Sequence, residues 1–178
     1  MRREIRLSGS GGQGLILAGI ILAEGAILSG LNSVQTQSYG PEARGGASKS
    51  EVIISDKDIN FPKVREADIL LCLTQKSFDE YSSTIKDNGI IVIDSSVNES
   101  DIEDKTVKLL KLPIIETAKV ELEKEMVANI VALGVMNEII DSVDSDMLKK
   151  AILARVPKGT EELNEKAFEL GSLLVKGR

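Results

Sequence analysis

The sequence predicts an α/β fold, namely a Rossmann-like, mostly parallel open sheet flanked by helices, with a helical C-terminal third. Two continuous apolar runs, ADILLCLT (67–74) and GIIVIDSS (89–96), are typical of parallel strands that are covered on both faces. The segment between them, 75–89, has a helical pattern, so the three together predict a β-α-β unit. A glycine-rich turn, GSGGQG (9–14), follows an alternating strand pattern and precedes an apolar helical run.

The remaining segments complete one domain that spans residues 1–178, without a linker or an internal repeat. Further strands are expected at 4–9, 32–40, 48–55 and 106–113. Helices are expected at 15–30, 114–124, 126–140, 144–156 and 160–177. The first of these helices contains only two polar residues, Glu24 and Ser29, which predicts burial on nearly all sides. It is too short to span a membrane.

Composition argues against several classes of function. The net charge of -6 and the aromatic content of 3% argue against a nucleic-acid-binding surface. With one cysteine and no histidine, the chain alone cannot ligate an iron–sulfur cluster, build a zinc site or supply a histidine base for hydrolysis. Cys72 lies in an apolar run and is expected to be a small buried hydrophobe. A single cysteine and the lack of a signal-peptide pattern favour the cytoplasm.

The GSGGQG turn fits the G-x-G-x-x-G pattern through Gly9, Gly11 and Gly14. Glycines permit a tight turn, and the helix that follows favours an anion at its N-terminus. A dinucleotide site also needs an acidic residue about 20 residues on to bind the ribose, but the second strand ends in TQSYG without an acid. A classical dinucleotide enzyme is therefore disfavoured. A tight turn without a ligand and an anion or cofactor site both stay open.

A second motif, SYGPEARGGASKS (38–50), gives the turn a context. Together the two motifs resemble the gamma subunit of the 2-oxoacid:ferredoxin oxidoreductases, and most closely the 2-oxoglutarate type. In that family a strand leads to G-x-G-G-Q-G, then to an LA helix, then to T-Q-S-Y-G-P-E-A-R-G-G, and all three are present here. The resemblance covers nearly the whole chain, through INFP (59–62), ADILLCLTQKSFDEY (67–81), NIVALG (129–134) and LNEKAFELG (163–171). Pyruvate, branched-chain 2-oxoacids and indolepyruvate remain alternative substrates.

The resemblance implies a subunit of an oxidoreductase complex that acts on the oxo group of its substrate. Such complexes oxidatively decarboxylate a 2-oxoacid with coenzyme A to acyl-CoA, CO2 and reduced ferredoxin. Thiamine diphosphate and magnesium are expected on the alpha and beta subunits. The iron–sulfur clusters are expected on the beta subunit or on a small ferredoxin-like delta subunit. This chain is expected to bind no cofactor or metal alone, to carry no catalytic residue, to touch neither nucleic acid nor membrane, and to be inactive in isolation. Its one domain is expected to be of the pyruvate/ketoisovalerate oxidoreductase gamma type.

The candidate ligand site combines the two motifs. Arg44 and the glycines after it offer a guanidinium and backbone donors that suit a phosphate or carboxylate, and the resemblance points to coenzyme A. If strands 4–9 and 32–40 are parallel neighbours, both motifs lie at the carboxyl edge of the sheet. The candidate residues are Gly9, Gly11, Gly12, Gln13, Gly14, Ser38, Tyr39, Arg44, Gly45 and Gly46.

Other interpretations of these residues remain open. Arg44 could form a salt bridge within or between subunits, Tyr39 could line a subunit interface, and Gln13 could merely cap the helix. Asn129, which lies among apolar residues, is expected to form a packing or interface hydrogen bond. The alternative to a subunit of an enzyme is a stand-alone Rossmann-like nucleotide-binding or scaffolding module without catalysis.

Overall fold

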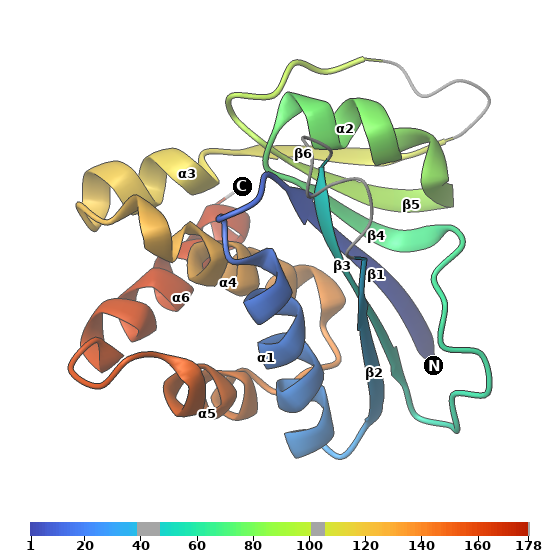
Figure 1. Cartoon of the computed structure of the whole chain (residues 1–178), viewed down its shortest axis with the longest axis horizontal. Coiled ribbons are helices and arrows are strands. Elements are labelled where there is room, and N and C mark those ends of the chain that lie inside the picture. Colours follow the sequence, from blue (N-terminus) through green and yellow to red (C-terminus); the bar gives the residue numbers. More distant parts are fainter. Residues whose placement is uncertain (39–46, 101–105, 178) are drawn as a thin grey trace.

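A computed structural model describes residues 1–38, 47–100 and 106–177 of the chain. Its centre is a six-stranded sheet in the order β2-β3-β1-β4-β5-β6 (Figure 1). The strands are β1 (Arg2–Gly9), β2 (Asn32–Gln37), β3 (Ser48–Ser55), β4 (Ala67–Cys72), β5 (Ile85–Asp94) and β6 (Lys108–Leu112). The pairs β1·β4, β4·β5 and β5·β6 are parallel, whereas β3 is antiparallel to both β1 and β2. The predicted α/β class is confirmed, with a mixed sheet.

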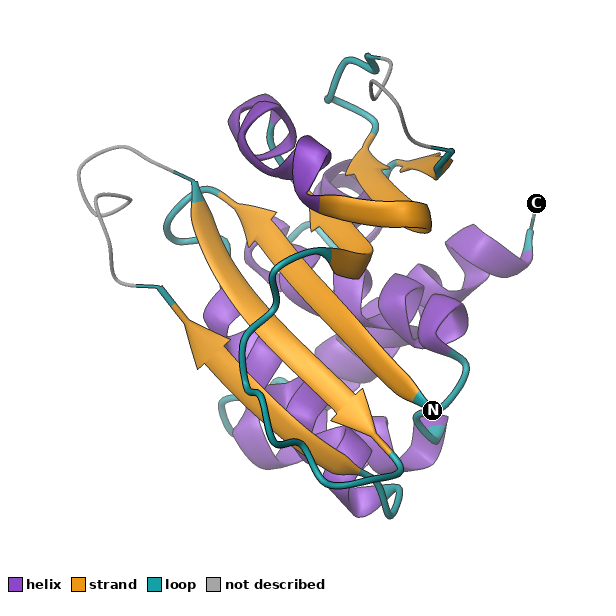
Figure 2. Ribbon diagram, turned by 90° about the vertical axis from the view of Figure 1, so that its right-hand side faces the viewer, coloured by secondary structure: helices purple, strands orange, loops and turns teal. Residues whose placement is uncertain are grey.

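The helices cover the two faces of the sheet unequally. Figures 1 and 2 show α2 on one face and α1, α4, α5 and α6 together on the other. The helical segments are α1 (Leu15–Leu28), α2 (Gln75–Tyr81), η2 (Ser82–Thr84), α3 (Ile114–Glu116), the π-helical turn η3 (Thr117–Glu121), η4 (Glu125–Val127), α4 (Ala128–Ile140), α5 (Ser145–Arg155) and α6 (Glu161–Lys176). Within the three described ranges, no helix has the length and apolar character needed to cross a membrane.

Two cores follow from the alternation of side chains along the strands. On β4, Ile69 and Leu71 pack with the large helical layer, whereas Leu70 and Cys72 pack on the α2 side. All four are buried, which explains why the sequence of this strand is apolar throughout rather than alternating. The larger core contains residues of α1, α4, α5 and α6, so the helical C-terminal third completes the fold on that face.

The predicted helix at 75–89 is wrong beyond Thr84, where the short 3-10 helix η2 ends. The helix α2 ends at Tyr81, and β5 begins already at Ile85, which is fully buried and pairs with Ala67 of β4. The Asn-Gly pair that was expected to end a helix lies inside β5, where the register against β4 shifts and Asn88 has a φ of 60°. The Asn-Gly pair therefore accommodates an irregularity in a strand, where Asn and Gly are also common.

The sheet places the ends of β1 and β2 at one edge. Both strands pair antiparallel with β3, so they run in the same direction, but β3 separates them. The condition that the two strands are parallel neighbours is therefore not met. The shared edge nevertheless exists, because Gly9 at the end of β1 pairs with Ser48, and Gln37 at the end of β2 pairs with Ser50. The glycine turn thus begins beside the first residue of β3.

Candidate functional site

The glycine turn, residues 10–14, joins β1 to α1 with two residues in the left-handed region. Gly12 has a φ of 87° and Gly14 a φ of 72°. Gly14 is the N-cap of α1, and no side chain caps the helix there. A left-handed backbone favours glycine because other residues bring Cβ too close to the following carbonyl. The turn therefore requires glycine at these two positions for its backbone path.

Gln13 holds the turn from the inside. Its Oε1 accepts a hydrogen bond from the backbone N–H of Ser10 at 2.7 Å. A Cβ on Gly9 would lie 2.2 Å from that oxygen and 2.8 Å from a methyl carbon of Leu15. Gly9 thus leaves room for both side chains, and its φ is not positive. The side chain of Gln13 therefore closes the turn. The suggestion that Gln13 caps the helix is wrong, because no side chain caps α1.

Asn129 reaches the same turn from the first turn of α4. Its Nδ2 donates to the carbonyl oxygen of Gly14 at 3.3 Å, and only 6% of the residue is exposed. A Cβ on Gly14 would lie 2.6 Å from that nitrogen, so helix and turn pack tightly. The prediction of a packing hydrogen bond for Asn129 is confirmed. Its partner could not have been found from sequence spacing, since 115 residues separate the two.

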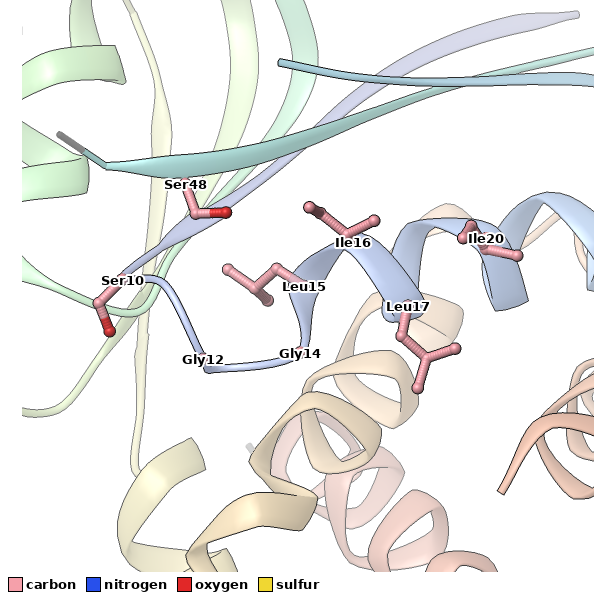
Figure 3. Close-up of a pocket in the computed structure, with 8 residues that line it drawn as sticks. All are labelled: Ser10, Gly12, Gly14, Leu15, Ile16, Leu17, Ile20 and Ser48. Carbon is pink, nitrogen blue, oxygen red and sulfur yellow. The ribbon is translucent and has the colours of Figure 1, made fainter. Parts of the chain in front are cut away.

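Two hollows flank the turn. One, of about 400 Å³, is lined by Ser10, Gly12, Gly14, Leu15, Ile16, Leu17, Ile20 and Ser48. Figure 3 shows Leu15 and Ile16 pointing from α1 toward the strand that carries Ser48. The other hollow, of about 230 Å³, is lined by Gly12, Gln13, Ile115, Glu125, Met126 and Ala128. Gly12 belongs to both, so a ligand in either hollow would touch the turn.

The hydrogen-bond donors that the turn offers to a ligand are backbone N–H groups. Among the described residues, the N–H groups of Gly11, Gly12 and Gly14 find no hydrogen-bond acceptor. They precede the positive end of the dipole of α1, a combination that favours an anion. None of the described residues that line the two hollows is basic. A cation for this site would have to come from elsewhere.

The other candidate residues divide into two groups. Ser38 follows β2 directly, at the sheet edge shared with the glycine turn, and is half-buried. The remaining four, Tyr39, Arg44, Gly45 and Gly46, lie outside the described residues. The structure therefore brings together the five candidates of the first motif, and it brings Ser38 to the same edge of the sheet.

The donor atoms of the chain do not fit an iron–sulfur cluster. Cys72 is fully buried, and burial raises the pKa of its thiol to about 11, although a hydrogen bond from Ser8 works in the opposite direction. The sequence contains no other cysteine and no histidine. In the part of the chain that the structure describes, no group of three or more Cys, Asp or Glu side chains could hold a metal ion. Cys72 is the small buried hydrophobe that was predicted.

Comparison with known proteins gives these features a family. The model of the pyruvate ferredoxin/flavodoxin oxidoreductase family matches residues 4–174. The 2-oxoglutarate synthase subunit KorC of Methanocaldococcus jannaschii is 50% identical over 178 residues, which cover 99% of this chain and 95% of that protein. The ketoisovalerate oxidoreductase subunit VorA of Methanothermobacter thermautotrophicus is 34% identical over 84% of this chain, but the match covers only 31% of VorA.

Solved structures agree with the sequence comparison. The gamma subunit of a keto/oxoacid ferredoxin oxidoreductase from Geobacter sulfurreducens matches with a TM-score of 0.89 and 47% identity, over 99% of this chain and 98% of that one. A 2-oxoglutarate:ferredoxin oxidoreductase from Magnetococcus marinus, solved with 2-oxoglutarate, coenzyme A and succinyl-CoA bound, matches with a TM-score of 0.87. At 24% identity, over 99% of this chain and 31% of that one, this second likeness shows the fold alone. The chain therefore belongs to the pyruvate ferredoxin/flavodoxin oxidoreductase family and is of its gamma-subunit type.

Proposed function

We propose that this chain is the gamma subunit of a cytoplasmic 2-oxoglutarate:ferredoxin oxidoreductase. The complex would convert 2-oxoglutarate and coenzyme A into succinyl-CoA and CO2 and pass two electrons to ferredoxin. The observation that carries the proposal is the 50% identity to a 2-oxoglutarate synthase subunit over almost the full length of both chains. The identity to the branched-chain relative VorA is lower, at 34%. The sequence GPEARGG (40–46) favours the same substrate.

We assign the redox chemistry to partner subunits. A cluster needs about four thiolates, and this chain has one cysteine, which is buried and protonated at neutral pH. Thiamine diphosphate with its magnesium ion and the iron–sulfur clusters would accordingly lie on the alpha and beta subunits, with or without a delta subunit. In this proposal the gamma chain, as one domain of residues 1–178, docks on those subunits.

The glycine turn is our candidate for a contribution to the coenzyme A site. Its free backbone N–H groups at the start of α1 suit a phosphate oxygen, and the apolar wall of Leu15, Ile16 and Ile20 suits an uncharged arm. Neither hollow has a described basic residue, so Arg44 is the proposed cation. The full proposed set comprises Gly9, Gly11, Gly12, Gln13, Gly14, Ser38, Tyr39, Arg44, Gly45 and Gly46.

The assignment of the reaction can be tested on the assembled complex. The chain would be purified together with the products of the neighbouring genes, and 2-oxoglutarate, pyruvate, 3-methyl-2-oxobutanoate and indolepyruvate would be compared with coenzyme A and ferredoxin. We expect the highest kcat/KM with 2-oxoglutarate. A higher value for another oxoacid would transfer the assignment to that substrate. An assembled complex that turns over none of them would favour the alternative, a scaffolding or nucleotide-binding module without catalysis.

Two variants test the role in coenzyme A binding. Arg44→Ala in the assembled complex should raise the KM for coenzyme A by ten- to a hundredfold, because one charge-assisted contact is worth about 1.5–3 kcal/mol. Gly12→Asp should raise it further than Gly12→Ala. Both variants carry the strain of a left-handed φ of 87° and meet nothing within 4 Å, but only Asp adds a carboxylate that repels a phosphate. Lys63→Ala is the control, because Lys63 lines a hollow beside Glu4, near the start of β1. Intact complexes with unchanged coenzyme A kinetics would refute the proposed site.

A further inference from the structure

Asn129 is a buried amide in an unusual position. It is the second residue of α4, a helix whose N-cap, Val127, provides no side-chain hydrogen bond. Asparagine is unfavourable within a helix because its side chain competes with the backbone. Here it does not cap its own helix but donates across the fold to Gly14, at the start of α1. Among the described residues, this is the one side-chain hydrogen bond that reaches the turn, residues 10–14, from outside the β1–α1 connection.

The acceptor lies at the joint between turn and helix. The carbonyl oxygen of Gly14 also receives the N–H of Ala18 at 3.0 Å, the first hydrogen bond of α1. A peptide group is planar and trans, so its C=O and N–H point in opposite directions. Fixing the carbonyl of Gly14 thereby fixes the direction of the N–H of Leu15. That N–H belongs to a residue that lines the larger hollow, and it has no acceptor among the described residues.

We propose that Asn129 is a positioning residue: it holds the Gly14–Leu15 peptide in the orientation that presents the turn's N–H groups to coenzyme A. The proposal rests on the proposed function of the turn. A left-handed glycine such as Gly14, with a φ of 72°, has other accessible conformations. Without Asn129, only the hydrogen bond from Ala18 would hold its carbonyl among the described residues, at a helix end, where helices fray. Gln13 cannot replace this contact, because it fixes the opposite end of the turn at Ser10.

The first experiment measures the turn directly, without a ligand. Amide hydrogen exchange of residues 9–18 would be followed in the full chain for the wild type, Asn129→Ala and Asn129→Leu, of which Leu keeps the volume without adding charge. The matched controls are Asn164→Ala and Asn164→Leu, since Asn164 is 4% exposed and donates to Thr160 O at 2.8 Å in another part of the fold. We expect about five- to tenfold faster exchange in the Asn129 variants alone, at the hydrogen-bonded amides of Ser10, Gln13 and Ala18. Unchanged exchange at these amides in both Asn129→Ala and Asn129→Leu would overturn the proposal.

The second experiment connects the turn to catalysis in the assembled complex. The Asn129 variants should raise the KM for coenzyme A about fivefold and leave kcat and the KM for 2-oxoglutarate within about twofold. One outcome is that the Asn129 variants speed up amide exchange at the turn without raising the KM for coenzyme A, whereas Gly12→Asp raises it. This outcome would refute the positioning role and leave the proposed function standing. If Gly12→Asp also has no effect, the proposed coenzyme A role of the turn fails, and the positioning role fails with it.

Discussion

At the residue scale, the glycines of the turn differ in whether backbone conformation and packing demand a glycine at their position. Gly14 combines a φ of 72° with a space already taken by Asn129, 2.6 Å from the position of a Cβ. Gly11 has neither restriction, since a Cβ there would meet nothing within 4 Å and its φ is not positive. The described residues therefore give no reason for a glycine at position 11. The proposed ligand would provide one.

This contrast predicts that two alanine substitutions change the free energy of unfolding by different amounts. Gly14→Ala should lower the free energy of unfolding by about 1–3 kcal/mol, because it adds left-handed strain to a steric clash. Gly11→Ala should change it by less than about 0.5 kcal/mol, since it meets open space. Urea unfolding of the two variants and the wild type measures the difference. Equal stabilities for all three would show that the turn does not adopt this conformation.

Burial of Cys72 predicts a loss of stability at alkaline pH. The pKa of the thiol is raised to about 11 in the folded chain from an ordinary value of 9.0, chiefly by burial. A raised pKa means that the unfolded chain ionises first, so stability is fully present below about pH 9 and declines from there to about pH 11. The expected loss is about 2–3 kcal/mol.

The variant Cys72→Ala isolates this contribution. It lacks the thiol but keeps every other group that titrates in the same range, so its own decline measures the background from lysines and tyrosines. Urea unfolding at pH 7, 9 and 10.5 for both proteins gives the difference. If the wild type and the variant lose the same free energy between pH 9 and pH 10.5, the thiol is not buried in the folded chain.

At the element scale, α4 and α6 approach each other closely through glycine. A Cβ on Gly134 would lie 2.1 Å from the backbone oxygen of Phe168, and one on Gly171 would lie 2.0 Å from that of Val131. Ser172 adds a hydrogen bond to the carbonyl of Gly134 at 3.4 Å. Both obstacles are backbone atoms, which cannot move aside as a side chain can. The two helices must separate if either glycine gains a side chain.

Gly134→Ala and Gly171→Ala should therefore each destabilise the fold. Alanine favours a helix over glycine by about 1 kcal/mol, but overpacking a core costs about 1–3 kcal/mol and occasionally more, so the clash with backbone should dominate. Leu173→Ala is the control on α6, because Leu173 is 58% exposed. Thermal unfolding should show a lower Tm for the two glycine variants than for the control. A higher Tm for Gly134→Ala would mean that propensity outweighs the contact.

The sequence predicted most elements but not how they pair. Apolar periodicity is a local property, so strand 48–55 and the last two helices could be located to within about one residue. The helix expected at 114–124 is wrong in its extent, since α3 ends at Glu116 and the π-helical turn η3 ends at Glu121. The end of α2 at Tyr81 was missed because Ile85 is buried by pairing with Ala67, a contact between distant residues. Local patterns do not encode strand order either, and the antiparallel β3 between β1 and β2 was not anticipated. In the site, the glycine motif was visible from its spacing, whereas the contact between Asn129 and Gly14 was not.

At the scale of the whole molecule, one relative carries the region that matches this chain within a longer polypeptide. The match to VorA covers 84% of this chain but only 31% of that protein, so there the equivalent region is continuous with a larger one. In the proposed complex, this chain would contact the other subunits through its surface. Its exposed apolar side chains include Met126 beside the glycine turn, at 81%, and Ile27 at the end of α1, at 56%. They are available for contact with a partner.

The chain alone should be catalytically silent. It has one cysteine, Cys72, which is fully buried, and no histidine, so it has neither ligands for a cluster nor an accessible thiolate. The purified single chain should be colourless. It should not reduce ferredoxin or a viologen with 2-oxoglutarate, pyruvate or a branched-chain 2-oxoacid in the presence of coenzyme A and thiamine diphosphate.

The co-purified complex at the same concentration is the positive control, and activity should appear when its other subunits are added to this chain. Oxoacid-dependent viologen reduction by the single chain would show that it carries a redox centre of its own, and the assignment of the chemistry to partner subunits would have to be abandoned.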